Sequence, residues 1–408
     1  MPTCVVGCDR TAVTMATQFA LKGLVTGIVS VDAQAIGEIA AGRLAFADEP
    51  AIAARIAAAQ AQAALVVTAE FDYAISQART IVVYERIRIG ADGRADYGRF
   101  DETIGRVGRA LTPGSLVLVE GVLAVGDMRG RVLPALEAAS GKTAGRDFLL
   151  AYATQRTGAG HILADTMRSP KIVAGLDLAS RDAAGAFLAR VMDTFMVATE
   201  ALEDAELVTL VETASRYVQG GFATELAAIA ARHGVDIRRV IAMANSQPYS
   251  WSPHPGLDSG GDEARLATVL LRDRHDSQLS RAALDIQETA LVEVVRTAAA
   301  MIGGLTGRRI GILGGPGGVA AAGTSAAKIG EAFRKEGATV GGIDDLAVFT
   351  ADERRAVDVL VVLGDRLGFD DLELSSWSRL ELLVDARNSF SKRRIEAAGV
   401  RYLGVGVG

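Results

Sequence analysis

The chain has 408 residues, of which 50% are hydrophobic and only 5% aromatic, and its formal net charge at pH 7 is −6. A chain of this length predicts two or three domains, with cores built from Ala, Val, Leu and Ile. The small acidic excess argues against a nucleic-acid partner and against binding to an anionic membrane surface, because both need basic patches.

The cysteine content and the N-terminus favour a cytoplasmic protein. Cys4 and Cys8 are the only cysteines, and both fall in or beside one predicted strand, where a disulfide is not expected. The sequence has no basic region followed by an apolar run at its start, and no uncharged apolar stretch of about 18 residues. The histidines are scattered without metal-ligand spacing, so no metal site is expected.

Short apolar runs alternate with helical patterns in the first third of the chain. Strands are predicted at residues 4–6, 25–31, 65–68, 80–84, 116–120, 148–152 and 171–175. A helix is predicted at residues 51–64, which are rich in alanine. Strands that alternate with helices indicate a parallel sheet covered on both faces.

The middle of the chain is predicted to be helical. Residues 183–233 read as helix with little interruption, and further helices are expected at residues 235–245 and 279–303, on either side of a loop at 246–261 rich in Pro, Gly and Ser. A helix of about 30 residues is about 45 Å long and needs a partner surface along it. We therefore expect a homodimer built on the central helices.

The last quarter repeats the strand, glycine turn and helix pattern from residue 308, with later strands at residues 357–364 and 382–388. The predicted fold class is α/β, with two Rossmann-like parallel-sheet domains joined by a central helical region that contains a long helix. The predicted domains are residues 1–182, 183–304 and 305–408.

Several stretches together resemble the UDP-glucose/GDP-mannose dehydrogenase family over essentially the whole chain. They are the AG and EP pairs at 41–42 and 49–50, residues 119–138, 148–166, 205–236 and 255–264, and the DARN ending at 385–408. The resemblance implies an NAD-binding Rossmann domain, a central dimerisation region and a C-terminal nucleotide-sugar domain. Members oxidise a sugar C6 alcohol to a carboxylate in two hydride transfers, with a cysteine that carries a thioester and a lysine and asparagine that hold the oxyanion.

This chain departs from the family at the positions that carry this chemistry. The cysteine position is Glu263, in the sequence GGDE, and the lysine and asparagine positions are Thr209 and Thr213. The family glutamate in Ser-Pro-Glu-Arg corresponds to Gln155. Two further replacements are Val122 for a threonine and Ala267 for an aspartate. Because a carboxylate cannot carry an acyl group as a thioester, we predict that the chain does not perform the four-electron oxidation.

The predicted cofactor turn is also altered. Of the three glycines of a dinucleotide fingerprint only Gly7 remains, and Asp9 and Ala12 take the other two places. Asp9 puts a negative charge where a diphosphate would approach, and Arg10 beside it offsets part of that charge. The ribose-binding acid is replaced by Ser30, and no arginine follows it to hold a 2′-phosphate. No cofactor is predicted for this turn, with NAD(P) kept as an open but disfavoured alternative. A strand–turn–helix kept for folding accounts for Gly7 without a ligand.

Other positions match the family pattern. They are Arg156, Arg216, Glu225, Gly260, Gly261, Arg387 and Asn388. The candidate substrate-binding residues are Arg156, Thr213, Gly260, Gly261 and Arg387. Arg387 suits a carboxylate or phosphate, although an ion pair with Asp385 explains it equally well. The glycine-rich turn after residue 314, with Gly318 at the family's lysine position, fits either a phosphate cradle or an ordinary turn.

Three functions remain open. The first is a repurposed biosynthetic enzyme that uses acid–base chemistry on a nucleotide-sugar-like or other small metabolite, with Glu263, Asp262, Thr209 and Gln155 as candidate catalytic residues. The second is an inert binding or partner protein, a pseudoenzyme. The third is an NAD(P)-dependent oxidoreductase that makes one hydride transfer without a thiol. The polar nature of the replacements favours the first, since a chain that merely lost activity need not gain new functional groups.

Overall fold

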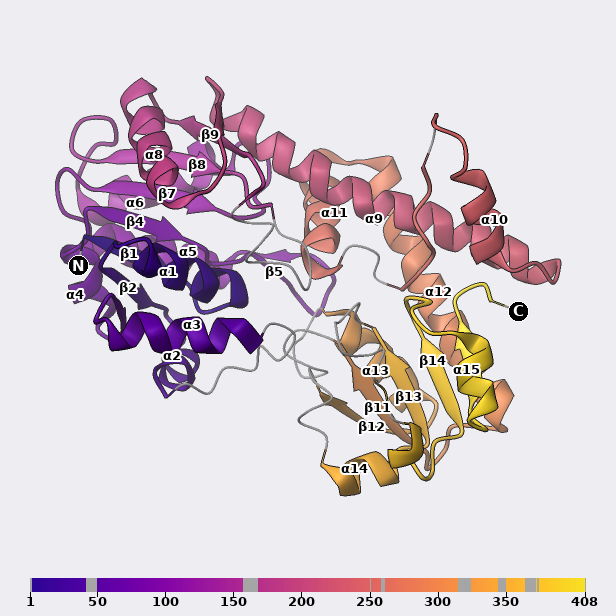
Figure 1. The fold of residues 1–408 in the computed structure, drawn as a ribbon. Helices are drawn as coiled ribbons and strands as arrows, with labels where there is room; N and C mark the ends of the chain where they lie inside the picture. The colour runs from indigo at the N-terminus through magenta and orange to yellow at the C-terminus, as the bar shows by residue number, and fades with distance from the viewer. Residues whose placement is uncertain are drawn as a thin grey trace. The chain divides into compact units, whose positions relative to one another are not determined.

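The computed structural model describes residues 2–41, 50–156, 168–249, 251–257, 261–314, 324–343, 350–363, 372 and 374–407. The chain forms two compact units (Figure 1). The first comprises Met1–Arg88 and Asp96–Glu212, and the second comprises Ile89–Ala95 and Thr213–Gly408. In the parts of the chain that the structure describes, no helix is long and apolar enough to cross a membrane.

The first unit is built on an eight-stranded sheet with the strand order β10-β9-β8-β7-β4-β1-β2-β3. The strands are β1 (Thr3–Val6), β2 (Thr26–Val29), β3 (Leu65–Val67), β4 (Thr80–Val83), β7 (Leu116–Glu120), β8 (Leu149–Ala153), β9 (Lys171–Gly175) and β10 (Met196–Ala198). All neighbours pair in parallel except β8 and β9, which are antiparallel. This arrangement confirms the predicted Rossmann-like sheet.

Helices cover this sheet because its central strands are apolar on both faces. Strands β1, β2 and β7 are buried at every position, and β4 is buried at all but its first residue. The helices are α1 (Arg10–Leu21), α2 (Ala33–Ala40), α3 (Pro50–Ala61), α4 (Phe71–Ser76), α5 (Gly98–Ala110), α6 (Leu133–Ser140) and α8 (Leu178–Val191). Phe19 of α1 packs edge-on against Phe187 of α8, with ring centroids 5.3 Å apart.

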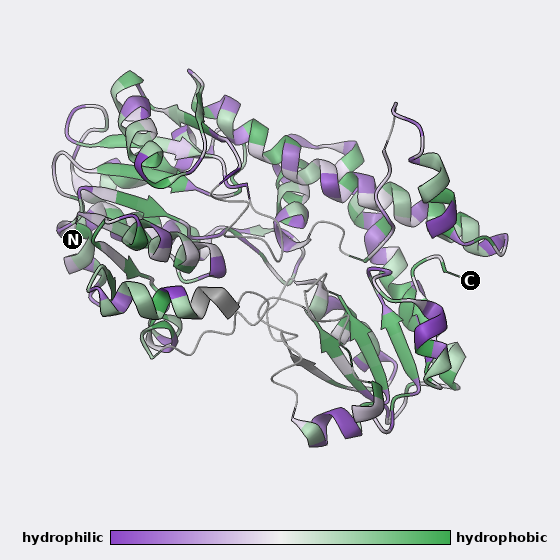
Figure 2. Ribbon diagram, viewed as in Figure 1, coloured by the Kyte–Doolittle hydropathy of each residue, from purple (hydrophilic) through white to green (hydrophobic). Residues whose placement is uncertain are grey.

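The second unit has a five-stranded parallel sheet with the order β12-β11-β13-β14-β15. Its elements are β11 (Arg309–Leu313), β12 (Thr339–Ile343), β13 (Val359–Val362), β14 (Leu382–Asp385), β15 (Arg401–Gly404), α10 (Ile237–Ala244), α11 (Gly261–His275), α12 (Gln278–Ile302), α13 (Ser325–Lys335), α14 (Ala351–Ala356) and α15 (Lys392–Ala397). Its core joins α12 and α13 to the sheet through residues such as Ile302, Phe333 and Val361. Strands β11, β13 and β14 are predominantly hydrophobic, as Figure 2 shows.

The long helix α9 (Leu202–Arg232) has 31 residues, close to the predicted length. One prediction about this region is wrong, because residues 183–233 are not a nearly continuous helix. Helix α8 ends at Val191, and strand β10 (Met196–Ala198) adds to the edge of the first sheet before α9 begins. The residues between the helices include Thr194, Phe195 and Val197, which are β-branched or aromatic and favour an extended backbone.

A short hairpin interrupts the first unit. It consists of β5 (Arg88–Ile89) and β6 (Ala95–Asp96), and its residues Ile89–Ala95 belong to the second unit. There the Gly93 carbonyl accepts a hydrogen bond from Arg272 Nη2 at 2.8 Å, and the Ala95 amide donates to Asp273 Oδ2 at 3.3 Å. The hairpin tip is therefore anchored to α11.

Candidate functional site

The first candidate site lies at the carboxyl ends of β1 and β4, where the order of the strands reverses. In doubly wound sheets this position forms the ligand crevice. Gly7 follows β1 with a φ of +142°, and a Cβ atom there would lie 3.1 Å from Ala12 Cβ and 3.3 Å from Tyr84 Cβ. Close packing of helix and strand thus requires Gly7, whether or not a ligand binds.

Asp9 occupies the anion-binding end of α1 with its own carboxylate. Its Oδ1 accepts a hydrogen bond from the Ala12 amide at 2.8 Å and so caps the helix. Its Oδ2 lies 3.3 Å from Nε of Arg86. Amides at this end of a helix are the groups that hold a diphosphate in dinucleotide-binding folds. Here one of them already has an anionic partner from the chain itself.

Arg99, on the first turn of α5, fills the neighbouring ribose position. Its Nη2 lies 3.2 Å from Ser30 Oγ and 3.3 Å from Cys8 Sγ, its Nη1 lies 3.0 Å from Asp32 Oδ2, and its Nε lies 3.0 Å from Glu85 Oε1. Burial raises the pKa of Glu85 although Arg99 opposes this shift. The pKa of Asp32 is lowered by the Ala35 amide and by Arg99.

The sequence motif does not predict this arginine. An arginine that binds a 2′-phosphate is expected just after β2, but Arg99 comes from a helix 69 positions beyond Ser30. Arg99 is hydrogen-bonded to Ser30 and Asp32 in the position of an adenosine ribose, whereas Glu85 Oε2 is buried without a hydrogen-bond partner among the residues that the structure describes. An adenosine ribose would have to displace Arg99 from Ser30 and Asp32.

A second polar cluster lies buried at the ends of β7 and β9. Lys171 and Glu120 form an ion pair with side chains 1% and 0% exposed, and Lys171 Nζ also donates to the Thr154 carbonyl at 3.1 Å. Burial raises the pKa of the Tyr84 hydroxyl well above its usual value, with Glu120 adding to the shift. No sequence pattern singled out this pair, because a lysine and a glutamate 51 positions apart carry no local signal.

The predicted residues of the first unit make internal contacts. Thr209 is 1% exposed, and its hydroxyl lies 2.8 Å from the hydroxyl of Tyr152. Gln155 donates from Nε2 to Thr11 Oγ1 at 3.3 Å. Arg156 pairs with Glu212 through two hydrogen bonds, one of them 2.9 Å from Nε to Oε2.

The remaining predicted residues belong to the second unit. Asp262 and Glu263 lie half-buried in the first turn of α11, after Gly261 with a φ of +75°. Carboxylates in the first turn of a helix are stabilised by the helix dipole, so folding alone also explains them. Thr213 is buried on α9. Gly260 and the turn around Gly318 lie outside the described residues.

Asp385 organises the loop that holds Arg387. Its carboxylate accepts hydrogen bonds from the amides of Arg387 at 3.2 Å and Phe390 at 2.7 Å, and from the Tyr402 hydroxyl at 2.9 Å. Asn388 follows with a φ of 55°, and its Nδ2 donates to the Val405 carbonyl at 2.9 Å. The Asp385 and Asn388 positions of the DARN segment are therefore explained by loop closure.

A cleft in the second unit joins α9, α11, α12 and α13 at the end of β13. It is lined by Tyr217, Leu257, Arg265, Gln287, Glu288, Leu291, Ser325, Lys328 and Leu363. Arg265 is only 3% exposed, and Lys328 forms an ion pair with Glu288. The sequence reading missed Arg265 and Lys328, which come together only when α11 and α13 fold beside the sheet. Among the described residues no group of three or more His, Cys, Asp and Glu side chains could hold a metal ion.

Comparisons with known proteins agree with this architecture. Residues 1–195 match the NAD-binding domain of the UDP-glucose/GDP-mannose dehydrogenase family. The UDP-N-acetyl-D-mannosamine dehydrogenase of Pyrococcus horikoshii is 27% identical over 166 residues, which are 41% of this chain and 39% of that relative. The sequence match thus spans about two fifths of that relative's length.

Solved structures resemble the whole chain in fold. The structure of UDP-D-ManNAc dehydrogenase from Pyrococcus horikoshii has a TM-score of 0.80 at 22% identity and covers 100% of this chain and 99% of its own. A UDP-glucose dehydrogenase from Pyrobaculum islandicum also has a TM-score of 0.80, at 20% identity, and covers 100% and 98%. Residues 1–195 thus match the NAD-binding domain of the UDP-glucose/GDP-mannose dehydrogenase family, and the whole chain shares the fold of these dehydrogenases.

Proposed function

We propose that this chain is a repurposed member of its family that does not oxidise a sugar C6 alcohol to a carboxylate with NAD. In this proposal it is a biosynthetic enzyme that binds a nucleotide-sugar-like metabolite and acts on it by acid–base chemistry. Asp262 and Glu263 supply the carboxylates, and the cleft beside α11 supplies the binding groups.

The observation that carries the proposal is the carboxylate of Glu263 at the nucleophile position implied by the family resemblance. Two-step oxidation of an alcohol to an acid in this family needs a thiolate that traps the aldehyde, and a carboxylate offers no equivalent acyl carrier. Cys8 contacts Arg99 and Ser30 in the first unit. Cys4 is fully buried in β1, and burial raises the pKa of its thiol to about 12. Neither thiol is suited to act as that nucleophile.

The cofactor crevice gives independent support. The Asp9 carboxylate accepts a hydrogen bond from an amide at the N-terminus of α1, and Arg99 donates hydrogen bonds to Ser30 and Asp32 after β2. A dinucleotide would have to displace both sets of contacts and accept the negative charge of Asp9. Two unit charges about 4 Å apart repel by about 1–4 kcal/mol at effective dielectric constants between 80 and 20.

The cleft beside α11 has a volume of about 20 Å³, room for about one water molecule, so a phosphorylated or carboxylated ligand would bind there only after the cleft opens. Arg265 and Lys328 bring two cationic side chains to its wall, and the guanidinium of a buried arginine suits planar oxyanions. Arg265 lies two residues after Glu263 on α11, so the two side chains leave the helix on different faces, and proton transfer by Glu263 requires a ligand that reaches from one face to the other.

The test is product analysis by mass spectrometry with UDP-glucose, GDP-mannose and UDP-N-acetylmannosamine, in the presence of NAD or NADP. We expect no cofactor reduction and no uronate, and a product of unchanged mass or of one water less. Glu263→Gln should abolish that product. The matched control is Glu293→Gln, which changes an exposed glutamate of α12 and should leave the product unchanged. Steady reduction of NAD with formation of a uronate contradicts the proposal.

A single hydride transfer with NADP is a second candidate, because Arg99 does lie beside Ser30. A serine and an arginine at this position are the kind of donors that a 2′-phosphate needs. A thermal shift with NADP(H) that is absent with NAD(H), and that is lost in Arg99→Gln, would favour this candidate over acid–base chemistry.

A further inference from the structure

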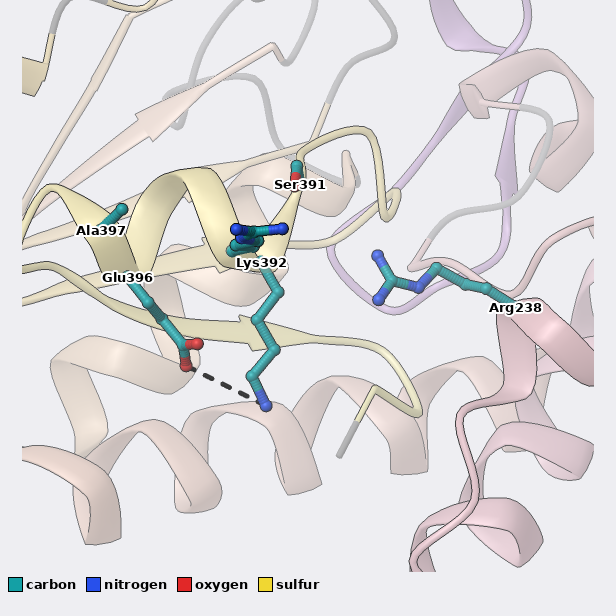
Figure 3. A pocket seen from close by; sticks show the side chains of 6 residues that line it. Arg238, Ser391, Lys392, Glu396 and Ala397 are labelled. Carbon is teal, nitrogen blue, oxygen red and sulfur yellow. Dashed lines mark ion pairs between the residues drawn. The ribbon is translucent and has the colours of Figure 1, made fainter.

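An open groove lies between α10 and α15 in the second unit, away from the cleft described above. It has a volume of about 560 Å³ and is lined by Arg238, Ser391, Lys392, Arg393, Glu396 and Ala397. Figure 3 shows the guanidinium of Arg238 pointing across the groove toward the start of α15. Three cationic side chains and one carboxylate thus face the same space.

Arg238 is held firmly but keeps part of its donor set. Its Nε and Nη2 donate to Asp236 at 3.2 and 3.0 Å. This pairing fixes the guanidinium plane, and it raises the pKa of Arg238 further. Asp236 binds Nε and Nη2, which leaves Nη1 as the remaining nitrogen of the guanidinium. Within the described residues, no hydrogen bond is found for Nη1.

The start of α15 contributes more donors. Ser391 precedes the helix, but its hydroxyl makes no capping hydrogen bond. Arg393 is exposed, and it makes no ion pair or hydrogen bond with the residues that the structure describes. Lys392 has its ammonium group 4.0 Å from Glu396, a distance at which an ion pair is weak.

These groups define the chemistry of an occupant. The lining presents a rigid guanidinium, a second guanidinium, an ammonium and a hydroxyl, all of which donate hydrogen bonds, against the single carboxylate of Glu396. Arginine forks match the oxygen geometry of phosphate groups, and the volume lies within the range of small-molecule sites. We propose that the α10–α15 groove binds the phosphate or diphosphate group of a small metabolite, at a site distinct from the cofactor crevice and from the cleft.

The test is isothermal titration of the full-length protein with inorganic pyrophosphate, with malonate as the carboxylate probe. We expect saturable binding of pyrophosphate at one site, at least tenfold tighter than that of malonate. Arg393→Ala should weaken pyrophosphate binding about tenfold. Arg334→Ala, which removes an exposed arginine from α13 in the same unit, is the matched control and should leave the affinity unchanged.

Three results would overturn the assignment. They are no saturable binding of pyrophosphate by the wild type, malonate binding as tight as that of pyrophosphate, and equal weakening by Arg393→Ala and Arg334→Ala. The last result would mean general attraction of an anion to positive charge. Because Arg393 is exposed and has no partner among the described residues, its removal should not disturb folding, and unchanged thermal unfolding of both variants provides the check.

Discussion

At the scale of single residues, Asp9 has two separable properties, a capping oxygen and a negative charge. Asparagine caps a helix about as well as aspartate, so Asp9→Asn should change the free energy of unfolding by less than about 1 kcal/mol. Loss of the charge should raise the affinity for NAD by about tenfold, equivalent to about 1.4 kcal/mol of repulsion. Titration with NAD, followed by the quenching of protein fluorescence, measures this change.

The matched control for that variant is Asp177→Asn. Asp177 caps α8 in the same way, with its Oδ1 2.7 Å from the Ser180 amide. It should show the same small effect on stability and no gain in affinity. Equal NAD affinity of the wild type and Asp9→Asn would show that the charge of Asp9 is not what disfavours the cofactor.

The buried pair of Lys171 and Glu120 predicts strong coupling. Lys171→Met leaves the Glu120 carboxylate buried without its cation, which should lower the free energy of unfolding by about 3–5 kcal/mol. The double variant Lys171→Met/Glu120→Leu removes both charges and should recover more than half of that loss. Urea denaturation of Lys171→Met, of Glu120→Leu and of the double variant measures the coupling. Additive losses of unfolding free energy would contradict it.

Glu206 predicts a pH dependence of stability. Its carboxylate accepts hydrogen bonds from the amides of Gly126 and Met128, each at 2.7 Å, yet burial raises its pKa from 4.5 to about 7. Between these two values the folded chain binds a proton that the unfolded chain releases. The contribution of Glu206 is therefore fully present below about pH 4.5 and falls as the pH rises toward 7, by about 3 kcal/mol in total.

Glu206→Gln removes this titration. The difference in unfolding free energy between the wild type and Glu206→Gln, measured in urea at several pH values, should therefore slope across this window and become flat above it. A difference that is constant with pH would show that Glu206 titrates at its ordinary pKa in the folded chain.

The sequence predicted site residues only where a known motif assigns a role to a position. Gly7 and Asp9 follow one predicted strand and Ser30 lies near the end of the next, and the structure places them at the carboxyl ends of β1 and β2. Arg99 and Arg265 have no such motif. Each lies on a helix whose position relative to the strands is set by tertiary packing, so no local spacing identifies it.

At the scale of elements, apolar runs identified most strands of both sheets, because the strands of a buried parallel sheet are continuous in hydrophobicity. The strands that were missed are short or polar at their ends. Strand β10 has three residues, two of them exposed, and β15 begins with exposed Arg401. Their hydrogen bonding to a sheet edge creates the strand, and that edge is not visible in the local sequence.

Helix α9 leaves an apolar stripe on its exposed face. Leu207, Val211, Phe222 and Ile229 are between 41% and 57% exposed, and their spacing places them on one side of the helix. A stripe of this kind on a long helix supports the predicted homodimer. Phe222→Asp should therefore convert a dimer to a monomer, as measured by light scattering after size exclusion. Leu279→Asp, at the 71% exposed start of α12, is the control and should leave the dimer intact.

At the scale of the whole molecule, each of the two units contains one sheet, mainly parallel in the first unit and fully parallel in the second, while the predicted division into three domains stays a prediction. The sequence indicated both sheets and the long helix from periodicity. It did not indicate that Ile89–Ala95 would leave the first unit and join the second, because this choice depends on Arg272 and Asp273, which lie about 180 positions later.

The anchored hairpin tip has a topological consequence. Since the chain passes from one unit to the other and back before its final crossing at Glu212, no single peptide-bond cleavage divides the protein into its two units. A fragment that ends at Glu212 still carries Ile89–Ala95, in which Gly93 and Ala95 have lost their hydrogen-bonding partners on α11. Neither unit is therefore encoded by one uninterrupted segment of the sequence, so truncating the chain at a single point cannot yield either unit intact.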